Sequence, residues 1–385
     1  MQESHYNRRQ WMKTGLGLAL GSTIPFSMRA EEQRYHQQVH PGTGRWMMED
    51  APGIIKARLT SNENPYGPSD RAKMAIIHGF KDANLYSRAV AIELKNKIAN
   101  YEGIKPEQVF LCAGLSEVLN LVGAVTGLEH GDLVSAHPTF DLMLTTATAI
   151  GGQWIKVPLN KQYQHDLPAM EAALTPKTKL LYICNPGNPC STIVDPDELS
   201  RFCERVSRKN LVFVDEAYND YIPDAARHSM LKRLKAGDHV MIGKTLSKVH
   251  GFAGLRVAYV MASKEFIKEL EKYRTWDFSM NAPSMHGALA TLDDEMFKKY
   301  CIQKNTEVRD MTVAGLQKLG YEPLPSYTNF LIFPIKKEGK EFVQMMQAKE
   351  VSLRSWSFDN KQWCRVSIGT QEEMQLFLHA LKELS

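Results

Sequence analysis

The chain has 385 residues, of which 43% are apolar and 23% charged, and a formal net charge of +4. This length exceeds that of a single hydrophobic core and predicts two domains in an ordinary soluble protein. The small net charge, without a basic run, argues against a nucleic-acid-binding protein. Six scattered cysteines show no CxxC pair, so we expect no metal site.

The first thirty residues differ from the rest of the chain. The paired arginines Arg8 and Arg9 precede Trp11 and Lys13, and a mildly apolar run extends from Thr14 to Phe26. This pattern resembles a twin-arginine export signal, and its apolar run is too short to span a bilayer. It predicts a periplasmic protein. An N-terminal amphipathic helix in a cytoplasmic protein is the alternative.

Residues 31–60 are interrupted by prolines and glycines and predict an extended arm. Ser69 is predicted to cap the next helix, and a further helical pattern runs from about residue 86 to residue 101. Apolar strand candidates then alternate with helical patterns such as Pro196–Arg208, which Asp195 should cap. The strand candidates are Gln108–Ala113, Asp132–Ala136, Gln153–Pro158, Lys179–Cys184, Leu211–Val214, His239–Ile242 and Arg256–Met261.

Such alternation predicts an α/β fold in which helices cover both faces of a mainly parallel sheet, assigned here to a large domain of residues 61–275. From residue 264 the pattern changes. A long helix is predicted over Lys264–Thr275, and an amphipathic helix over residues 371–384. Short strands are predicted at Tyr321–Pro325, Asn329–Phe333, Val351–Arg354 and Cys364–Ile368. Residues 276–385 should therefore form a smaller α+β domain.

One loop, Gly243–Tyr259, concentrates groups suited to a phosphate. It contains the hydroxyls of Thr245 and Ser247, the lysines Lys244 and Lys248, and Arg256 among glycines. Phosphates favour charge-assisted donors and close approach of the main chain. A lysine near another cation has a lowered pKa and can act as a nucleophile. The loop thus suggests a lysine that bonds covalently to a phosphorylated cofactor, with a basic surface loop as the alternative.

Several motifs at the ends of predicted strands complete this pattern. They read AGLSE at 113–117, NPGNP at 185–189, DEAY at 215–218, and TLSK at 245–248 followed by GLR. This ordered set resembles that of the fold-type I, class I/II aminotransferases, which depend on pyridoxal 5'-phosphate. The segments SNENPYGPS at 61–69 and RVSIGT at 365–370 are similar to those of the histidinol-phosphate aminotransferase branch. The resemblance implies an aspartate aminotransferase-like fold.

The resemblance also implies roles for individual residues. Lys248, rather than Lys244, would hold the cofactor as a Schiff base and move a proton between the substrate and the cofactor. Asp215 would pair with the pyridine nitrogen, although a helix cap is the alternative for this aspartate. Asn188 and Tyr218 would hydrogen-bond the phenolic oxygen, and Asn188 would also lie beside the substrate. By itself, Asn188 would be interpreted as a turn residue.

The implied phosphate site lies at a helix start, where the helix dipole favours an anion. It would use the backbone amides of Leu115 and Ser116 together with the side chains of Thr245 and Arg256. Phe140 matches the aromatic residue that stacks on the pyridine ring, with an ordinary core phenylalanine as the alternative.

Further matches concern the substrate and a second subunit. Arg365 matches the arginine that binds the substrate carboxylate. Tyr66, with Asn64 beside it, would close over the substrate. Tyr86 matches a tyrosine that reaches the cofactor phosphate of a neighbouring subunit, which implies a homodimer with shared sites. Arg354 matches an arginine for a substrate phosphate, but the loop after it is unlike the family's, and a surface arginine is the alternative.

A second departure is Cys190-Ser191, where the family usually has Thr-Gly, and it could place a thiol or hydroxyl beside the cofactor. The sequence as a whole predicts a pyridoxal-phosphate-dependent transaminase that moves an amino group between an amino acid, or a histidinol-phosphate-like amine, and a 2-oxo acid. The same fold also supports racemases, lyases and oxidases, and a non-catalytic homologue is a third possibility.

Overall fold

The computed structural model describes residues 55–274 and 279–384, which belong to one compact unit spanning Glu49–Ser385. The predicted export signal and most of the predicted arm lie outside the described residues. The division into domains at residue 275 stays a prediction. Among the described helices, none is long and apolar enough to cross a membrane.

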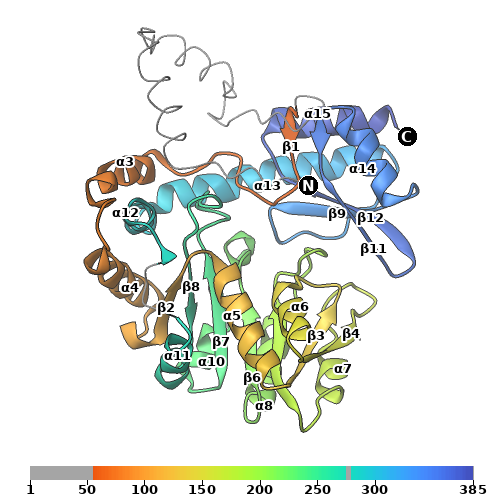
Figure 1. Ribbon diagram of the computed structural model, residues 1–385. Coiled ribbons are helices and arrows are strands. Elements are labelled where there is room, and N and C mark those ends of the chain that lie inside the picture. Colours follow the sequence, from red (N-terminus) through yellow and green to blue (C-terminus); the bar gives the residue numbers. More distant parts are fainter. Residues whose placement is uncertain (1–54, 275–278, 385) are drawn as a thin grey trace, which may run out of the picture. The chain divides into compact units, whose positions relative to one another are not determined.

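A seven-stranded sheet forms the centre of the larger part, with strand order β2-β8-β7-β6-β5-β3-β4 (Figure 1). All neighbouring strands are parallel except β8, which runs antiparallel to both β2 and β7. The predicted mainly parallel sheet is therefore confirmed. The strands are β2 (Val109–Cys112), β3 (Asp132–His137), β4 (Gln153–Pro158), β5 (Thr178–Cys184), β6 (Leu211–Asp215), β7 (Val240–Thr245) and β8 (Ala258–Met261).

Both faces of this sheet are covered by helices because successive side chains of a strand point to opposite faces. In β2, Val109 and Leu111 join one hydrophobic cluster, whereas Phe110 and Cys112 join another. The first cluster includes side chains of α3 (Asp70–Gly79), α4 (Arg88–Glu102), α7 (Leu167–Ala172), α8 (Pro196–Val206), α10 (Leu231–Lys235) and α12 (Ala282–Thr291). The second includes side chains of α5 (Leu115–Leu128), α6 (Leu142–Ala149) and α11 (Lys264–Glu271).

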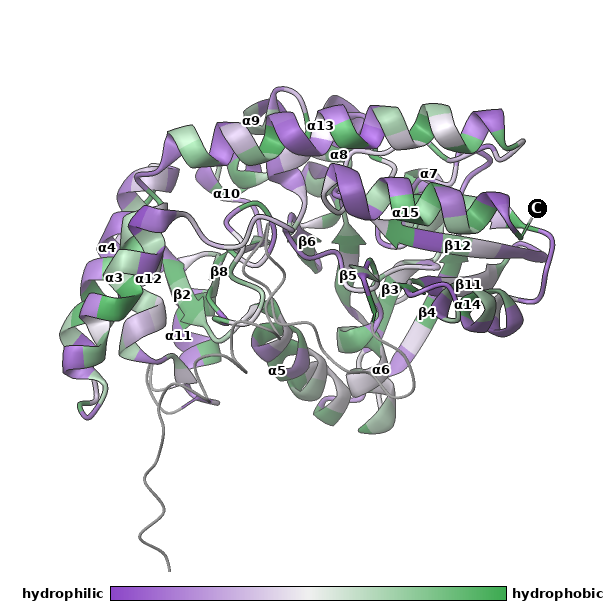
Figure 2. Cartoon of the chain, turned by 90° about the horizontal axis from the view of Figure 1, so that it is seen from above, coloured by the Kyte–Doolittle hydropathy of each residue, from purple (hydrophilic) through white to green (hydrophobic). Residues whose placement is uncertain are grey.

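The smaller part contains a three-stranded antiparallel sheet with the order β11-β12-β9. A separate parallel pair joins β1 (Ala57–Arg58) to β10 (Val351–Ser352), so the end of the predicted arm packs with the C-terminal part of the chain. The remaining strands are β9 (Phe330–Ile335), β11 (Arg354–Phe358) and β12 (Lys361–Ser367), and the helices are α13 (Glu295–Lys318), α14 (Gly339–Gln347) and α15 (Gln371–Lys382). Figure 2 shows α13 and α15 banded with polar and apolar residues, as helices that lie on a core should be.

Both predicted helix caps are present. The Ser69 side chain accepts a hydrogen bond from the Ala72 amide, and Asp195 accepts from Asp197 and Glu198. Two predicted elements were wrong. The helix that begins at Lys264 ends at Glu271, short of the predicted end.

The second error is the strand predicted at Tyr321–Pro325, which is absent. Pro323 and Pro325 lack the amide hydrogen that a strand donates to its neighbour. Only the Leu324 amide in this segment bonds to the sheet, at 2.9 Å from the Ile332 carbonyl.

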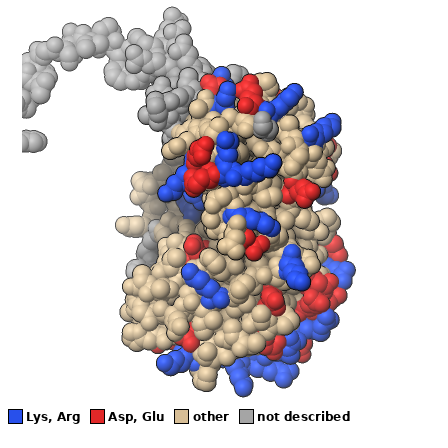
Figure 3. Space-filling view, turned by 90° about the vertical axis from the view of Figure 1, so that its right-hand side faces the viewer, with Lys and Arg blue, Asp and Glu red and all other residues tan. Residues whose placement is uncertain are grey.

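On the face of the molecule drawn in Figure 3, acidic and basic side chains lie interspersed.

Candidate active site

Three neighbouring parallel strands end side by side at one edge of the large sheet. Cys184 at the end of β5 lies opposite Asp215 at the end of β6, and Asp215 lies opposite Gly243 in β7. Ligands of open α/β sheets bind at the carboxyl ends of parallel strands. The loop after β5, the DEAY segment and the lysine loop therefore meet at the edge where a ligand site is expected.

Lys248 lies partly buried in the loop after β7. Its Nζ donates to the backbone oxygens of Asn62 at 3.1 Å and Ser61 at 3.4 Å, and it lies 5.4 Å from the centre of the Tyr218 ring. In the described part of the chain, no carboxylate forms an ion pair with it. Burial, and then the positive charge of Arg365, lower the pKa of Lys248 to about 8. An appreciable fraction of this amine is therefore neutral near physiological pH.

Asp215 lies at the end of β6 and is 3% exposed. Its Oδ2 accepts a hydrogen bond from the Tyr182 hydroxyl at 2.9 Å, and its Oδ1 accepts from the Ala217 amide at 3.0 Å. Burial raises the pKa of Asp215 to about 6, although both hydrogen bonds and the charge of Lys248 oppose the rise. Asp215 has no ion-pair partner in the part of the chain that the structure describes, and such a buried carboxylate is suited to bind a cationic group such as a protonated ring nitrogen.

Asn188 and Tyr218 are connected to the smaller part of the chain. The Asn188 Oδ1 accepts a hydrogen bond from the Arg365 Nη1 at 2.7 Å, and the Tyr218 hydroxyl accepts from the Asn62 Nδ2 at 3.0 Å. The Arg365 Nη2 donates to the Thr60 carbonyl at 2.7 Å. Burial raises the pKa of Tyr218, so its hydroxyl stays protonated and can donate to an oxygen.

Arg365, in β12, is a buried arginine with 3% of its surface exposed. Its Nε has no hydrogen-bond partner among the described residues, and its guanidinium lies 5.3 Å from the centre of the Phe330 ring. Burial lowers the pKa of Arg365 to about 10, and Arg354 contributes to the shift. A buried cation with an unused donor is suited to bind a substrate carboxylate.

Two of the predicted phosphate ligands, Arg256 and Ser116, meet at the start of α5. The Arg256 Nη2 donates to the Ser116 hydroxyl at 2.9 Å, and a Cβ placed on Gly114 would lie 1.9 Å from the same nitrogen. Only glycine therefore lets the guanidinium lie across the start of α5, where the amides of Leu115 and Ser116 belong to the first turn and have no acceptor within the helix. The Thr245 hydroxyl bonds to that of Ser247 at 2.9 Å. This donor set fits the phosphate of pyridoxal 5'-phosphate.

The four other predicted residues have different surroundings. Phe140 is partly buried against the second hydrophobic cluster. Tyr66 lies partly buried with its ring 5.3 Å from that of Tyr300. Arg354 is exposed and pairs in register with Arg365 across β11 and β12. Tyr86 is 85% exposed and lines a separate cavity of about 1040 Å³.

The departure at Cys190-Ser191 is buried. Ser191 has a φ of 60°, a conformation that suits the glycine found there in the family. Its hydroxyl donates to the Cys190 and Pro325 carbonyls, at 2.5 and 3.1 Å, which fixes this turn to the segment before β9. Burial raises the pKa of the Cys190 thiol to about 12, so this thiol stays protonated.

Sequence analysis missed two residues of the network. Tyr182 lies within β5, where an aromatic residue is normally interpreted as core. Asn62 has a φ of 54°, bonds to Tyr218 through its side chain, and accepts from Lys248 through its carbonyl. An asparagine in a turn-rich segment is the only signal that the sequence offers for its conformation.

Comparisons with known proteins agree with this geometry. Residues 54–381 match the family model for aminotransferases of class I and II. A histidinol-phosphate aminotransferase of Moorella thermoacetica is 36% identical over 330 residues, which cover 85% of each chain. Histidinol-phosphate aminotransferase 1 of Bacillus cereus is 33% identical over 93% of this chain and 97% of its own. The crystal structure of the Sinorhizobium meliloti histidinol-phosphate aminotransferase with pyridoxal-5'-phosphate has a TM-score of 0.78 at 24% identity, covering 86% of this chain and 91% of its own.

Proposed function

Because the chain belongs to the class I and II aminotransferases, in the histidinol-phosphate aminotransferase branch, we propose that Lys248 is the catalytic lysine of a pyridoxal-phosphate-dependent transaminase. The observation that carries this assignment is the amine of Lys248, which is partly buried, has no carboxylate ion pair in the described chain, and has a pKa lowered to about 8. The family implies pyridoxal 5'-phosphate as cofactor, and the donor set around Ser116 and Arg256 fits its phosphate.

When bound, the cofactor supplies an aldehyde that condenses with amines and a ring that accepts electrons from the substrate α-carbon. The chain's own residues would position the cofactor and transfer protons. Arg256, Ser116 and Thr245 would hold the phosphate, and Asp215 would keep the ring nitrogen protonated. Tyr218 and Asn188 would donate to the phenolic oxygen, and Lys248 would carry the proton to and from the α-carbon.

Substrate binding would depend on two arginines of the smaller sheet. Arg365 would bind an anionic group next to the reacting carbon, because its guanidinium is buried beside Asn188. Arg354 lies opposite it on β11 and contributes to its lowered pKa, so the two positive charges are close together. We therefore infer that one substrate of the pair carries a second anionic group, such as a carboxylate or a phosphate.

The test compares spectra and fixation of the cofactor. Adding an amino acid without an oxo acid should convert the bound cofactor stoichiometrically to its amine form, and adding a 2-oxo acid should reverse the change. A racemase, lyase or oxidase would turn over without this conversion. Wild-type protein that fails to bind the cofactor covalently after incubation would exclude the catalytic assignment.

The second-anion proposal needs matched substrates. Amines that differ only in a terminal phosphate should differ in kcat/KM by at least about tenfold in wild type, since a hydrogen bond to a charged group is worth about 1.5–3 kcal/mol. Arg354→Gln should reduce the difference to a few-fold. A preference for the phosphorylated amine that survives Arg354→Gln would assign the contact elsewhere.

We propose further that the enzyme is a homodimer in which Tyr86 completes the partner's site. The large cavity beside Tyr86 is lined by apolar side chains that include Phe80 and Leu85, at 64% and 60% exposure. Apolar groups left exposed to this extent are typical of an interface. Tyr86→Phe should weaken cofactor binding, and mixing it with Lys248→Ala protein tests whether the sites are shared. A monomer at assay concentration would exclude the proposal.

The paired arginines near the N-terminus support export, and we propose a periplasmic location. Arg8→Lys combined with Arg9→Lys should leave the enzyme in the cytoplasmic fraction without changing its activity. Export that persists in this double variant would exclude the twin-arginine route.

A further inference from the structure

A second cavity, of about 500 Å³, is lined in part by β7 and by Leu246 and His250 of the loop that carries Lys248. It is large enough for an amino acid, and polar groups from α4, β7, α13 and the segment after β6 surround it. Among them are Glu102, Glu216, Asn219, Asp220, Lys244 and Lys298. Apart from Thr245, which belongs to the predicted phosphate site, these polar groups have no role in the transamination described above.

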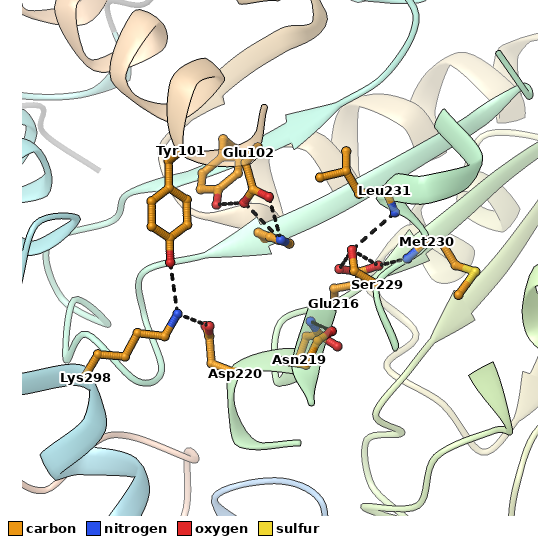
Figure 4. Close-up of polar contacts among 12 residues, drawn as sticks. Tyr101, Glu102, Glu216, Asn219, Asp220, Ser229, Met230, Leu231 and Lys298 are labelled. Atoms are coloured by element: carbon orange, nitrogen blue, oxygen red, sulfur yellow. Dashed lines mark hydrogen bonds and ion pairs between the residues drawn. The ribbon is translucent and has the colours of Figure 1, made fainter. Parts of the chain in front are cut away.

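Two carboxylates of this cavity already have cationic partners (Figure 4). The Lys244 Nζ lies 2.9 Å from both oxygens of Glu102, which also accepts a hydrogen bond from Tyr259 at 2.6 Å. The Lys298 Nζ lies 2.6 Å from Asp220 and 3.1 Å from the Tyr101 hydroxyl. Within each pair the positive and negative charges neutralise each other, so neither pair leaves a net charge for a ligand to compensate.

Glu216 is different, because it is 3% exposed and no cation lies within ion-pair distance of it in the described chain. Its oxygens accept only from the Ser229 hydroxyl, at 2.8 and 3.1 Å, and from the Met230 amide at 2.6 Å. Burial raises the pKa of Glu216 to about 7, although Lys244 and these donors oppose the rise. A cation bound beside it would remove this electrostatic cost.

Asn219 supplies a buried acceptor without a hydrogen-bond partner among the described residues. It is 6% exposed, and its amide nitrogen donates to the Ala225 carbonyl at 3.0 Å. Its Oδ1 is buried and has no hydrogen-bond partner among the described residues. Buried acceptors in native proteins are nearly always paired. In Figure 4, Asn219 lies between the Glu216 cluster and the Asp220–Lys298 pair.

The opposite charge occurs on α10, where the exposed Lys232 and Lys235 line the same cavity. The cavity therefore combines a buried acceptor end with a cationic exposed end. We propose that it is a binding site for a small zwitterion, an amino acid or a related compound, whose ammonium group contacts Glu216 and Asn219 and whose carboxylate contacts Lys232 and Lys235.

The position of this site connects it to the catalytic residues. Glu216 follows Asp215 directly, and its amide donates to the Gly243 carbonyl of β7 at 2.9 Å. Lys244 and Thr245 of the same strand line the cavity and precede Lys248. A ligand that bound there would contact the strand that carries the cofactor loop, without occupying the substrate site.

The test uses N,N-dimethylglycine and the holoenzyme in titration calorimetry. This probe is a zwitterion with an N–H donor, and its tertiary amine cannot condense with the cofactor aldehyde. Wild-type protein should bind it, whereas acetate and N,N-dimethylethylamine, which each carry one of its charges, should bind at least about tenfold more weakly.

Variants then separate the two sites. Lys235→Glu, on the exposed end, and Glu216→Gln, at the buried end, should each weaken dimethylglycine binding by about tenfold or more. Arg365→Lys, in the substrate site, should leave it within about twofold. Absence of binding in wild type, equal binding of acetate, or loss of binding in Arg365→Lys alone would each overturn the proposal. Lys235→Glu keeps the test valid if Glu216→Gln does not fold.

Discussion

Lys244 and Lys248 lie four residues apart in one segment, yet their surroundings differ. Lys244 lies in β7 with its amine 2.9 Å from both oxygens of Glu102. Among the described residues, the amine of Lys248 instead contacts two backbone carbonyls and the face of Tyr218. Burial lowers the pKa of both amines. At Lys244 burial is the largest single influence, but the charges of Glu102 and Glu216 and the hydrogen bond to Glu102 together outweigh it and raise the pKa. At Lys248 burial and the charge of Arg365 lower the pKa to about 8.

The difference shows that burial alone does not make a reactive lysine. The charged group beside the amine determines its pKa, because a carboxylate stabilises the ammonium form and a neighbouring cation destabilises it. Lys244 should therefore contribute to stability and Lys248 to chemistry. Each of the following variants tests one side of this contrast.

The largest effect is expected from Lys248→Ala. Losing both the covalent attachment and the proton carrier should lower kcat by roughly 10³-fold or more. Borohydride should no longer fix the cofactor to the chain, as mass spectrometry of the intact protein would show. Lys244→Met is the matched control and should retain fixation. Fixation that follows Lys244 instead would reverse the assignment of the two lysines.

Lys244→Met should lower the stability of the folded protein. It leaves the buried Glu102 carboxylate without its cation, and breaking such a pair costs about 3–5 kcal/mol of unfolding free energy. Urea unfolding measures this loss. The control is Lys264→Met, since the Lys264–Glu107 pair lies 3.8 Å apart with both side chains 49% exposed and should contribute little to stability. Equal losses in the two variants would contradict the contrast.

Asp215→Asn should stabilise the cofactor-free protein. The pKa of Asp215 is raised from 3.8 to about 6 in the folded protein. Its burial therefore lowers the free energy of unfolding little below pH 4, where the carboxyl is protonated in both the folded and the unfolded protein, and lowers it most above pH 6. Removing the charge should add up to about 3 kcal/mol at pH 7 and little at pH 4, by urea unfolding. A gain that does not change with pH would show that the raised pKa is not its source.

Tyr182→Phe should have the smallest effect. It removes the hydroxyl that donates to Asp215 at 2.9 Å, and one bond to a charged group is worth about 2 kcal/mol. The pKa of Asp215 should rise further, and the pH profile of cofactor binding should shift upward with it. The control is Tyr163→Phe, which removes an exposed hydroxyl 2.9 Å from Asp359. It should change neither the pKa of Asp215 nor the pH profile of cofactor binding. An unshifted profile in Tyr182→Phe would make Tyr182 a packing residue only.

The sequence predicted the sheet well because its strands are apolar runs between helices with strong caps such as Asp195. It also placed Asp215 and Lys248 on one edge, since parallel strands end together. It could not predict the hydrogen bond from Tyr182 or the positive φ of Asn62, because both depend on packing between distant segments. The strand expected at Tyr321–Pro325 failed for a local reason, the two prolines within it.

The choice between the two lysines shows the same limit. Spacing favoured Lys248 only through resemblance to a family, whereas the carboxylate that pairs with Lys244 comes from α4, far away in sequence. No local pattern could reveal that Glu102 lies there.

The most direct test of the contrast is the pH dependence of covalent attachment. Cofactor-free protein is mixed with pyridoxal 5'-phosphate between pH 6 and pH 11, quenched with borohydride at early times, and the modified lysine is identified by peptide mass spectrometry. The initial rate at Lys248 should reach half of its maximum near pH 8, the pKa of the buried amine. A half-maximum near pH 10.5, the ordinary value for lysine, would contradict the account.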